Sequence, residues 1–522
     1  MSRQNRDTVP EPATHWKGEI DMSWEIDWLK NRAGITPNRI AVVDGDTKEC
    51  WTYAQLNDRA NQLAAYFLSL GIQKGDRIVL VSPNHISYFD LYFACEKIGA
   101  IFVPLNWRLS NAEIQYIIRD CLPSLIAYHS DVKELIGNIV AFSTLKVDSQ
   151  SYAEHLLFEK EFQCTHPIQK EDPLAIIYTG GTTGNPKGVV LTHQSIFCNS
   201  TNTILSWNLN GNDTTLTVLP MFHTGGLFSL TIPLLQIGGK VVFTSKFDPE
   251  KTVDLLNGEL CTIVLLVPTM HHMVIETSAF QHSEFPSMHT FLSGGAPCPH
   301  VIYQAYEQKG LTFKEGYGLT EAGPNNFYMD PSDVSNKKGS VGKPMLFNEA
   351  LLINDDGTEA DPDEVGELLI KGYHVFDHYW NNPEQTKATK VKGWLHTGDL
   401  AKKDKDGYFY IVGRKKDMII TGGENVYPLE VEHVLAEHKY VSEVAVVGVS
   451  HDKWGEIVVA YIAPKRENTI YEDELKAFCQ QKLGGYKVPK KFIFVEELPK
   501  THVGKIDKKQ LMGIEIFDLD NG

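Results

Sequence analysis

The segment at residues 178–188, YTGGTTGNPKG, combines four glycines, three threonines and one lysine. Glycine permits positive φ angles and a close approach of the backbone, so successive N–H groups can point at one anion. The hydroxyls of Thr179, Thr182 and Thr183 add hydrogen-bond donors, and Lys187 adds a positive charge. This segment therefore predicts a loop that binds a polyphosphate.

The loop does not follow the Walker pattern GxxxxGK[ST]. Its glycine run begins with Gly180 and Gly181, but five residues after Gly181 the sequence has Pro186, and glycine follows Lys187. A P-loop NTPase or an ordinary kinase is therefore disfavoured. Taken alone, the segment leaves open a flexible hairpin loop that is rich in glycine without binding anything.

Strands are expected on both sides of this loop, at residues 176–178 and 189–192. Upstream, apolar residues recur at helical spacing from Leu56 to Leu70, and Gly71 follows as a helix end. The same alternation of strand and helix continues, with strands predicted at residues 77–81, 101–105, 216–219, 240–244 and 262–267. The pattern predicts an α/β fold with a large N-terminal domain of stacked βα subdomains.

After residue 350, the alternation of predicted strands and helices gives way to short runs separated by turns. Short runs separated by turn signals at residues 351–371 predict a β-rich subdomain that closes the large domain. Beyond Asp399 the chain becomes rich in lysine, and we expect a small α+β C-terminal domain there. Its predicted strands lie at residues 443–449, 457–463 and 491–495, and its predicted helices at residues 429–437 and 471–482.

The composition is that of a globular protein of more than one domain, with 522 residues of which 42% are hydrophobic. The formal net charge of −17 (49 basic minus 66 acidic residues) disfavours a nucleic-acid partner or an anionic membrane surface. The eight cysteines are scattered without a zinc-binding pattern, which indicates reduced thiols. We see no secretory leader and no integral membrane segment, and expect a cytoplasmic protein.

Seven motifs, taken in their order along the chain, resemble the acyl-adenylate-forming superfamily of acyl-CoA synthetases, carrier-protein adenylation domains and luciferases. The resemblance is greatest to fatty-acid and aryl-acid CoA ligases, and it spans nearly the whole chain. The motifs are YTGGTTGNPKG (178–188), PMFHTGG (220–226), SGGAP (293–297), EGYGLTEAG (315–323), GWLHTGD (393–399), GRKKDMIITGGENVYPLEVE (413–432) and LPKTHVGKI (498–506).

The resemblance assigns a nucleotide site to several of these motifs. It implies that Tyr317 stacks on adenine, that Asp399 binds the ribose hydroxyls and that Arg414 assists there. Taken alone, Tyr317 is typical of a core aromatic, and Asp399 of a cap or turn residue. The full set of residues implied to bind ATP is Thr179, Gly180, Gly181, Thr182, Thr183, Lys187, Gly295, Ala296, Pro297, Glu315, Gly316, Tyr317, Asp399 and Arg414.

Three residues are implied to be catalytic. Thr320 would donate to a phosphate oxygen, and Glu321 would hold Mg²⁺ against the polyphosphate. Lys505 would bridge the attacking carboxylate and the α-phosphate, offsetting the repulsion between two anions. Outside this context, Glu321 and Lys505 are typical of solvated surface residues.

The resemblance also implies a mobile C-terminal domain with a hinge at Lys416. Residues 1–415 would form the AMP-binding N-terminal domain and residues 416–522 the C-terminal domain. Rotation about the hinge would bring Gly422, Gly423 and Glu424 to the site, where the glycines would line a tunnel for the pantetheine arm of CoA. A simple turn before the following helix is the alternative at Gly422 and Gly423.

The implied acyl pocket is framed by His223, Gly226, Gly294 and Gly318, with apolar neighbours such as Phe222. His223 is either an aromatic gate or a buried, satisfied histidine. We expect a hydrophobic acid, with a medium- or long-chain fatty acid favoured over an aryl acid such as a benzoate or cinnamate derivative.

The sequence thus predicts an ATP-dependent, AMP-forming acyl-CoA ligase, a monomer or homodimer that uses ATP, Mg²⁺ and CoA. An adenylation enzyme that loads a carrier protein is the alternative, although no carrier domain follows in the chain. An inactive nucleotide-binding scaffold is disfavoured, because it would not need Lys187, Glu321, Asp399, Arg414 and Lys505 together.

Overall fold

We describe a computed structural model of the chain. The structure describes residues 27–136, 142–156, 167–180, 186–296, 298–451, 453–465, 470–501 and 505–512. Within this part of the chain, no helix is both long and apolar enough to cross a membrane. No disulfide joins the seven cysteines that it contains.

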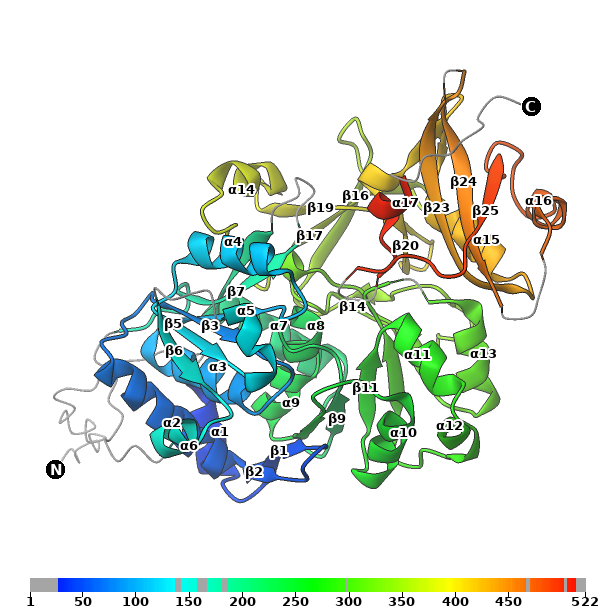
Figure 1. Cartoon of the computed structure of the whole chain (residues 1–522). Helices are drawn as coiled ribbons and strands as arrows, with labels where there is room; N and C mark the ends of the chain where they lie inside the picture. The colour runs from blue at the N-terminus through cyan, green and yellow to red at the C-terminus, as the bar shows by residue number, and fades with distance from the viewer. Residues whose placement is uncertain are drawn as a thin grey trace, which may run out of the picture.

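The first sheet has six strands in the order β6-β5-β3-β4-β7-β8, and its last two strands flank the predicted phosphate loop in the sequence (Figure 1). All its pairings are parallel except that of β7 with β8, which is antiparallel. The strands are β3 (Arg77–Val81), β4 (Ile101–Leu105), β5 (Leu125–Tyr128), β6 (Ser143–Lys146), β7 (Pro173–Thr179) and β8 (Lys187–Thr192).

The second sheet has seven strands in the order β13-β12-β11-β9-β10-β1-β2, parallel except for the β1–β2 pair. Parallel strands end at the same edge, so the loops after β12 and β13 lie side by side. The strands are β1 (Ile40–Asp44), β2 (Cys50–Thr52), β9 (Thr214–Thr217), β10 (Lys240–Phe243), β11 (Ile263–Leu266), β12 (Thr290–Ser293) and β13 (Phe313–Glu315).

Helix α3 (Ser87–Ile98) shows how closely the large domain is packed. Every one of its 12 residues is buried, and it ends where Gly99 adopts a φ of 69°. The other helices around the two sheets are α1 (Trp28–Ile35), α2 (Tyr53–Ser69), α4 (Asn111–Cys121), α5 (Lys133–Ile136), α6 (Gln150–His155), α7 (His193–Ser206), α8 (Thr224–Leu227), α9 (Thr231–Ile237), α10 (Pro249–Gly258), α11 (Pro268–Ile275), α12 (Ser278–His282) and α13 (His300–Gln308), with short 3-10 turns η1 (Ser130–Val132) and η2 (Thr320–Ala322).

A β-rich subdomain follows, as the turn signals predicted. Its five-stranded sheet is entirely antiparallel, and the short pair β14–β15 connects it to the second sheet. Its elements are β14 (Phe327–Tyr328), β15 (Lys343–Pro344), β16 (Glu349–Ile353), β17 (Val365–Lys371), α14 (Pro383–Thr389), β18 (Lys390–Val391), β19 (Trp394–Lys403) and β20 (Phe409–Arg414).

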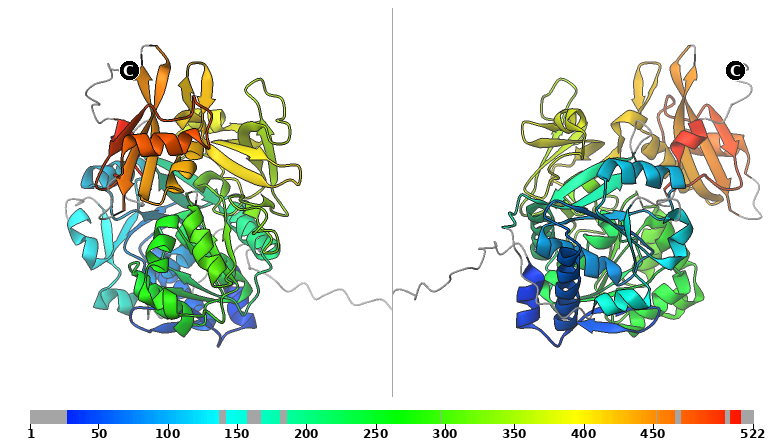
Figure 2. Two further views of the ribbon diagram at one scale, coloured as in Figure 1. Left: turned by 90° about the vertical axis from the view of Figure 1, so that its right-hand side faces the viewer. Right: turned by 60° about the vertical axis from the view of Figure 1, so that its left-hand side comes forward.

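The C-terminal part forms its own sheet, drawn in orange and red in Figure 2, with separate apolar clusters on its two faces. The core of the large domain reaches Phe409, and that of the C-terminal part begins at Ile419. The elements are η3 (Lys415–Asp417), β21 (Ile419–Thr421), β22 (Glu424–Val426), α15 (Pro428–Ala436), β23 (Val441–His451), β24 (Gly455–Pro464), α16 (Glu472–Gln480), β25 (Lys491–Phe494) and α17 (Lys508–Met512).

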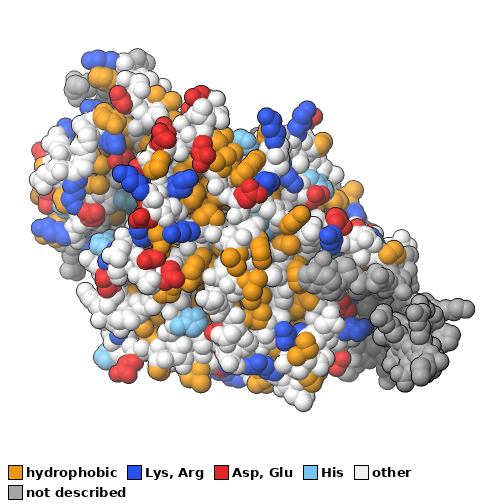
Figure 3. Space-filling model, turned by 180° about the vertical axis from the view of Figure 1, so that it is seen from behind, with side chains coloured by type: hydrophobic (Ala, Val, Ile, Leu, Met, Phe, Trp, Pro, Cys, Tyr) orange, Lys and Arg blue, Asp and Glu red, His pale blue; other side chains and the backbone are white. Residues whose placement is uncertain are grey.

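The structure confirms the α/β fold class with a large N-terminal and a small α+β C-terminal domain, while the boundary at residues 415 and 416 stays a prediction. The face seen from behind carries acidic and basic side chains intermingled around a central band of hydrophobic ones (Figure 3). Among the described residues on this face, we see no continuous basic area of the kind that binds a polyanion.

Candidate functional site

The loops after β12 and β13 form the floor of the candidate site. The backbone N–H of Gly316 donates to the carbonyl of Ser293 at 2.8 Å, which ties the two loops together. Gly295 has a φ of +82°, a conformation that favours glycine, and Ala296 beside it is exposed. Pro297 lies outside the described residues.

A hydrogen-bonded group begins in the loop after β13. It consists of Tyr317, Asp399 and Arg414. The Tyr317 hydroxyl donates to Asp399 Oδ2 at 2.5 Å, and Arg414 Nε lies 2.6 Å from Oδ1. Asp399 and Arg414 face each other across the antiparallel strands β19 and β20. The Asp399 side chain is buried, which raises its pKa, while Arg414 and the Tyr317 hydroxyl oppose this rise. The structure thus brings together the three residues predicted to hold adenine and ribose.

Lys505 reaches the same place from the C-terminal domain. A Cβ placed on Gly295 would lie 4.0 Å from Lys505 Cε. Although Lys505 is exposed as a residue, the protein around its ammonium group lowers its pKa; Arg414 lowers it further and Asp399 raises it. Residues 502–504 of the predicted LPKTHVGKI motif lie outside the described residues.

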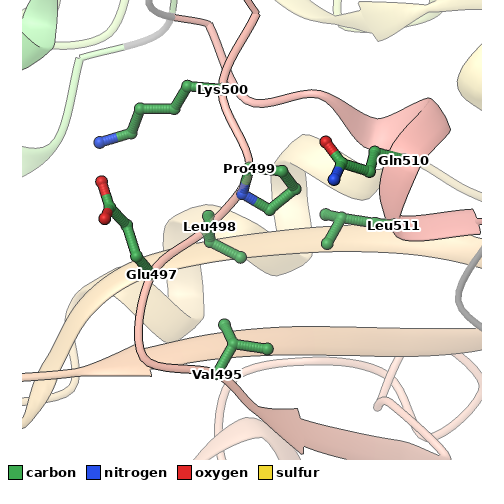
Figure 4. Close-up of a pocket in the computed structure, with 7 residues that line it drawn as sticks. All are labelled: Val495, Glu497, Leu498, Pro499, Lys500, Gln510 and Leu511. Carbon is green, nitrogen blue, oxygen red and sulfur yellow. The ribbon is translucent and has the colours of Figure 1, made fainter.

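The segment that carries Lys505 is anchored in the core of the C-terminal domain. The backbone N–H of Thr501 donates to the carbonyl of Lys505 at 2.6 Å. Leu498 and Leu511, both buried, flank this segment and line a surface pocket of about 450 Å³ (Figure 4). None of the residues that line this pocket is among those predicted to bind ATP, the acid or CoA.

The phosphate loop is described at its two ends only, because Gly181, Thr182 and Thr183 lie outside the described residues. Thr179 ends β7, Gly180 has open space where a Cβ would stand, and Lys187 begins β8. Lys187 Nζ donates to Gln385 Oε1 at 3.1 Å and lies 5.8 Å from the centre of the Tyr379 ring. Lys187 therefore lies next to helix α14.

Thr320 and Glu321 stand in the turn η2 that follows Tyr317. The Tyr379 hydroxyl donates to Glu321 Oε1 at 2.7 Å. No group of three or more His, Cys, Asp or Glu side chains that could hold a metal ion occurs among the described residues. A single carboxylate fits Mg²⁺, which proteins commonly bind through one or two carboxylates together with substrate phosphates.

The side chain of Glu315, the last residue of β13, is hydrogen-bonded within the protein. Its carboxylate accepts from the Tyr303 hydroxyl at 2.5 Å and from the backbone N–H of Cys298 at 3.2 Å. Burial raises its pKa to about 7, and both hydrogen bonds oppose this rise. The side chain thus fastens the loop after β12, and only the backbone of Glu315 remains for the nucleotide contact that the resemblance implies.

His223 precedes helix α8 at the predicted acyl pocket. Its Nε2 atom is buried and has no hydrogen-bond partner in the described part of the chain. Burial lowers the pKa of His223 to about 4, and the nearby charges of Lys505 and Arg108 lower it too. The imidazole is therefore neutral at pH 7 and leaves one polar atom for a ligand.

The three glycines predicted at this pocket have different surroundings. A Cβ on Gly226 would lie 2.2 Å from the carbonyl oxygen of Pro220, and one on Gly318 would lie 2.0 Å from that of Pro324. At both positions, a close backbone approach requires glycine, which is a different reason from leaving room for an acid. At Gly294 a Cβ would have an ordinary contact of 3.4 Å with Leu265.

This close approach gives a stability prediction for Gly318→Ala. We expect the free energy of unfolding to fall by about 2–3 kcal/mol, because backbone atoms cannot yield to the new methyl group. Thermal and urea unfolding measure the change. Gly34→Ala is the matched control, since a Cβ there meets nothing within 4 Å; equal stability of the two variants would contradict the prediction.

Gly422, Gly423 and Glu424 belong to the exposed hairpin of β21 and β22. Gly422 and Gly423 have φ angles of +60° and +86°, and the Gly422 N–H donates to the carbonyl of Trp454 at 2.8 Å. The hairpin is thus held on its own domain, while Lys505 is the group from this domain that enters the site. Lys416, the predicted hinge, lies in η3 between the two cores.

Sequence reasoning missed Tyr379 and Gln385. Both belong to the segment around α14, and they contact Glu321 and Lys187 across sequence separations of 58 and 198 residues. The Asn-Pro pair at the start of α14 signals a helix, but it carries no sign of these contacts.

Two family models match the chain: "AMP-binding enzyme" over residues 29–380 and "AMP-binding enzyme C-terminal domain" over residues 430–505. The chain belongs to the AMP-binding enzyme family. The resemblance to the acyl-adenylate-forming superfamily is confirmed, and the protein is an enzyme of the AMP-forming acid–CoA ligase type.

Relatives in this AMP-binding family are similar over nearly their full length. A feruloyl-CoA synthase from Amycolatopsis is 37% identical over 93% of this chain and 97% of its own, and a long-chain-fatty-acid–CoA ligase from Mycobacterium tuberculosis is 35% identical over 93% and 97%. The solved structure of an O-succinylbenzoate coenzyme A synthetase from Bacillus subtilis, in complex with ATP and magnesium ion, has a TM-score of 0.83 and 29% identity, covering 93% of this chain and 99% of that one.

Proposed function

We propose that this enzyme joins a hydrophobic carboxylic acid to CoA in two half-reactions at one site. The observation that carries the proposal is the meeting of Tyr317, Asp399 and Arg414 with Lys505, which arrives from a separate domain. The first three groups suit a nucleoside, and the fourth suits the reacting phosphate and carboxylate.

In the first half-reaction, a carboxylate oxygen of the acid attacks the α-phosphorus of ATP. The P–O bond to the β-phosphate breaks, pyrophosphate leaves, and an acyl-AMP anhydride remains. Lys505 offsets the repulsion between the carboxylate and the phosphate, and it stabilises the charge on the transferring group. Lys187 and the hydroxyl of Thr179 bind the departing phosphates.

Mg²⁺ held by Glu321 would neutralise charge on the polyphosphate. The fit rests on the carboxylate of Glu321, of which one oxygen accepts the Tyr379 hydroxyl and the other remains for a cation. Thr320 beside it would donate to a phosphate oxygen. The named ATP and magnesium complex of a relative supports both ligands.

In the second half-reaction, the thiol of CoA attacks the acyl carbon, the bond to AMP breaks, and a thioester forms. A free thiol has a pKa near 8.5, so it loses its proton as the bond forms at neutral pH. Rotation at Lys416 would exchange Lys505 for the hairpin with Gly422, Gly423 and Glu424. The CoA ligase and synthase relatives support CoA rather than a carrier protein as the acceptor.

For the acid, we favour a compact aryl acid over the medium- or long-chain fatty acid favoured by the sequence, because a feruloyl-CoA synthase shares 37% identity with this chain, against 35% for a long-chain-fatty-acid–CoA ligase. A cavity of about 10 Å³ between β9, β11 and α8, next to Gly225 and Gly226, has room for about one water molecule and therefore holds neither kind of acid. Leu219, Leu230 and Leu265 line it, so apolar side chains surround these glycines. The names of the relatives support both an aryl and a fatty acid.

A panel of acids tests the proposal. Purified enzyme is incubated with ATP, Mg²⁺ and benzoate, ferulate, octanoate or palmitate, and the release of AMP and pyrophosphate is measured with and without CoA. We expect kcat/KM for the best aryl acid to exceed that for palmitate by at least about 10-fold.

Other outcomes of the panel contradict separate parts of the proposal. ADP as the product would overturn adenylation. Acyl-AMP that accumulates in the presence of CoA would point to a carrier protein as the acceptor. A preference for palmitate would restore the fatty acid.

A further inference from the structure

Tyr379 connects two parts of the proposed ATP site that lie far apart in the sequence. It is 6% exposed and lies between β17 and α14. Its backbone forms a bridge with Val189, and the next residue, Trp380, donates its N–H to the carbonyl of Gly188 at 2.7 Å. The backbone of Tyr379 is therefore attached to β8, the strand that leaves the phosphate loop.

The side chain of Tyr379 reaches Glu321. Its hydroxyl donates to Glu321 Oε1 at 2.7 Å, and the backbone N–H of Phe376 donates to the Glu321 carbonyl at 2.8 Å. Phe376 is fully buried, with its ring centre 4.8 Å from that of Tyr379. Glu321 is thus held through its main chain and its side chain by one short, well-packed segment.

The face of the same ring lies toward Lys187, whose ammonium is 5.8 Å from the ring centre. A cation at this distance from an aromatic face is attracted by the ring quadrupole. Gln385 accepts a hydrogen bond from Lys187 at 3.1 Å, and the backbone N–H of Tyr379 donates to Thr386 Oγ1 at 2.9 Å. One tyrosine therefore contacts a cation with its face and a carboxylate with its hydroxyl.

The Tyr379 hydroxyl is the donor in its hydrogen bond with Glu321. A phenol is protonated at neutral pH, so it can donate this hydrogen bond. Because the hydroxyl occupies one oxygen of Glu321, the carboxylate keeps a fixed rotamer and offers its second oxygen to another group.

We infer that Tyr379 is a positioning residue for ATP and its divalent cation, which holds Glu321 at a fixed separation from Lys187. A polyphosphate between the two would meet the lysine directly and the carboxylate through the cation. This inference rests on the roles proposed above for Glu321 and Lys187.

Calorimetric titration with ATP tests the inference without turnover, because no carboxylic acid is present. The dissociation constant for ATP is measured for the full chain in excess Mg²⁺ and in EDTA. For Tyr379→Phe, which keeps the ring, we expect the gain in affinity on adding Mg²⁺ to shrink by roughly 5- to 10-fold, since Glu321 loses its orienting bond. Affinity for ATP in EDTA, and affinity for AMP, should stay within about twofold of wild type.

Three further variants make the outcome decisive. Tyr373→Phe, at a position 76% exposed, is the matched control and should behave as wild type. Glu321→Gln should lose the Mg²⁺-dependent gain, and Tyr379→Phe added to it should have no further effect on this gain.

Each contrary result has a distinct meaning. If Glu321→Gln loses the gain and Tyr379→Phe keeps it, the inference alone is overturned. A fall in AMP affinity together with a lower Tm in Tyr379→Phe would also overturn it, because that is the signature of a purely structural residue. If Glu321→Gln keeps the gain, the inference fails together with the proposed metal role of Glu321.

Discussion

Lys505→Ala is expected to slow the formation of acyl-AMP by more than about 100-fold, which is the usual cost of removing one group that stabilises transition-state charge. Thioester formation from preformed acyl-AMP and CoA should stay within about threefold of wild type, because this step breaks the acyl–oxygen bond and transfers no phosphoryl group. Pyrophosphate exchange into ATP measures the first step, and CoA consumption with supplied acyl-AMP measures the second.

The control for this variant is Lys509→Ala, an exposed lysine on α17. It removes the same charge from the same domain without touching the site, and both half-reactions should be unchanged. If Lys505→Ala reduces both half-reactions equally, Lys505 does not have a role confined to adenylation.

Gly423→Leu is expected to have the opposite pattern. The thiol step should slow by roughly 100-fold, because a side chain at this position would fill the tunnel proposed for pantetheine. Pyrophosphate exchange should persist, since the hairpin with Gly423 is exposed when Lys505 is at the site.

Backbone strain alone would also affect this variant, because Gly423 has a φ of +86°. Gly357→Leu controls for it: Gly357 has a φ of +85°, is also exposed, and lies in a turn of the β-rich subdomain. If the two variants slow thioester formation to the same extent, the tunnel assignment is wrong.

Much of the fold was predictable because the sequence patterns that indicate its helices and strands are local. Apolar spacing from Leu56 to Leu70 gave α2, and the strand, helix and strand at residues 77–105 appear as β3, α3 and β4. Where the end of a strand differs from its predicted position, pairing with the neighbouring strands sets its position. The strand expected at residues 216–219 is β9 (Thr214–Thr217), because its register is set by pairing with β10.

The site was predictable as a set of motifs and much less as a set of contacts. Nothing in the sequence directs the Glu315 carboxylate toward Tyr303 and Cys298, since that depends on how β12 and β13 pair. Gly318 fits the predicted motif, but the carbonyl of Pro324, six residues later, requires glycine there. Contacts of this kind arise only when the chain has folded.

The arrival of Lys505 from the second domain has a consequence for how the enzyme is made. Chains are synthesised from the N-terminus, and N-terminal domains generally fold first. The residues proposed to hold adenine and ribose, Tyr317, Asp399 and Arg414, all precede the C-terminal sheet that carries Lys505. We therefore expect a nascent chain to complete the proposed nucleotide pocket on the ribosome before Lys505 has been translated, so that nucleotide binding would precede turnover during biosynthesis.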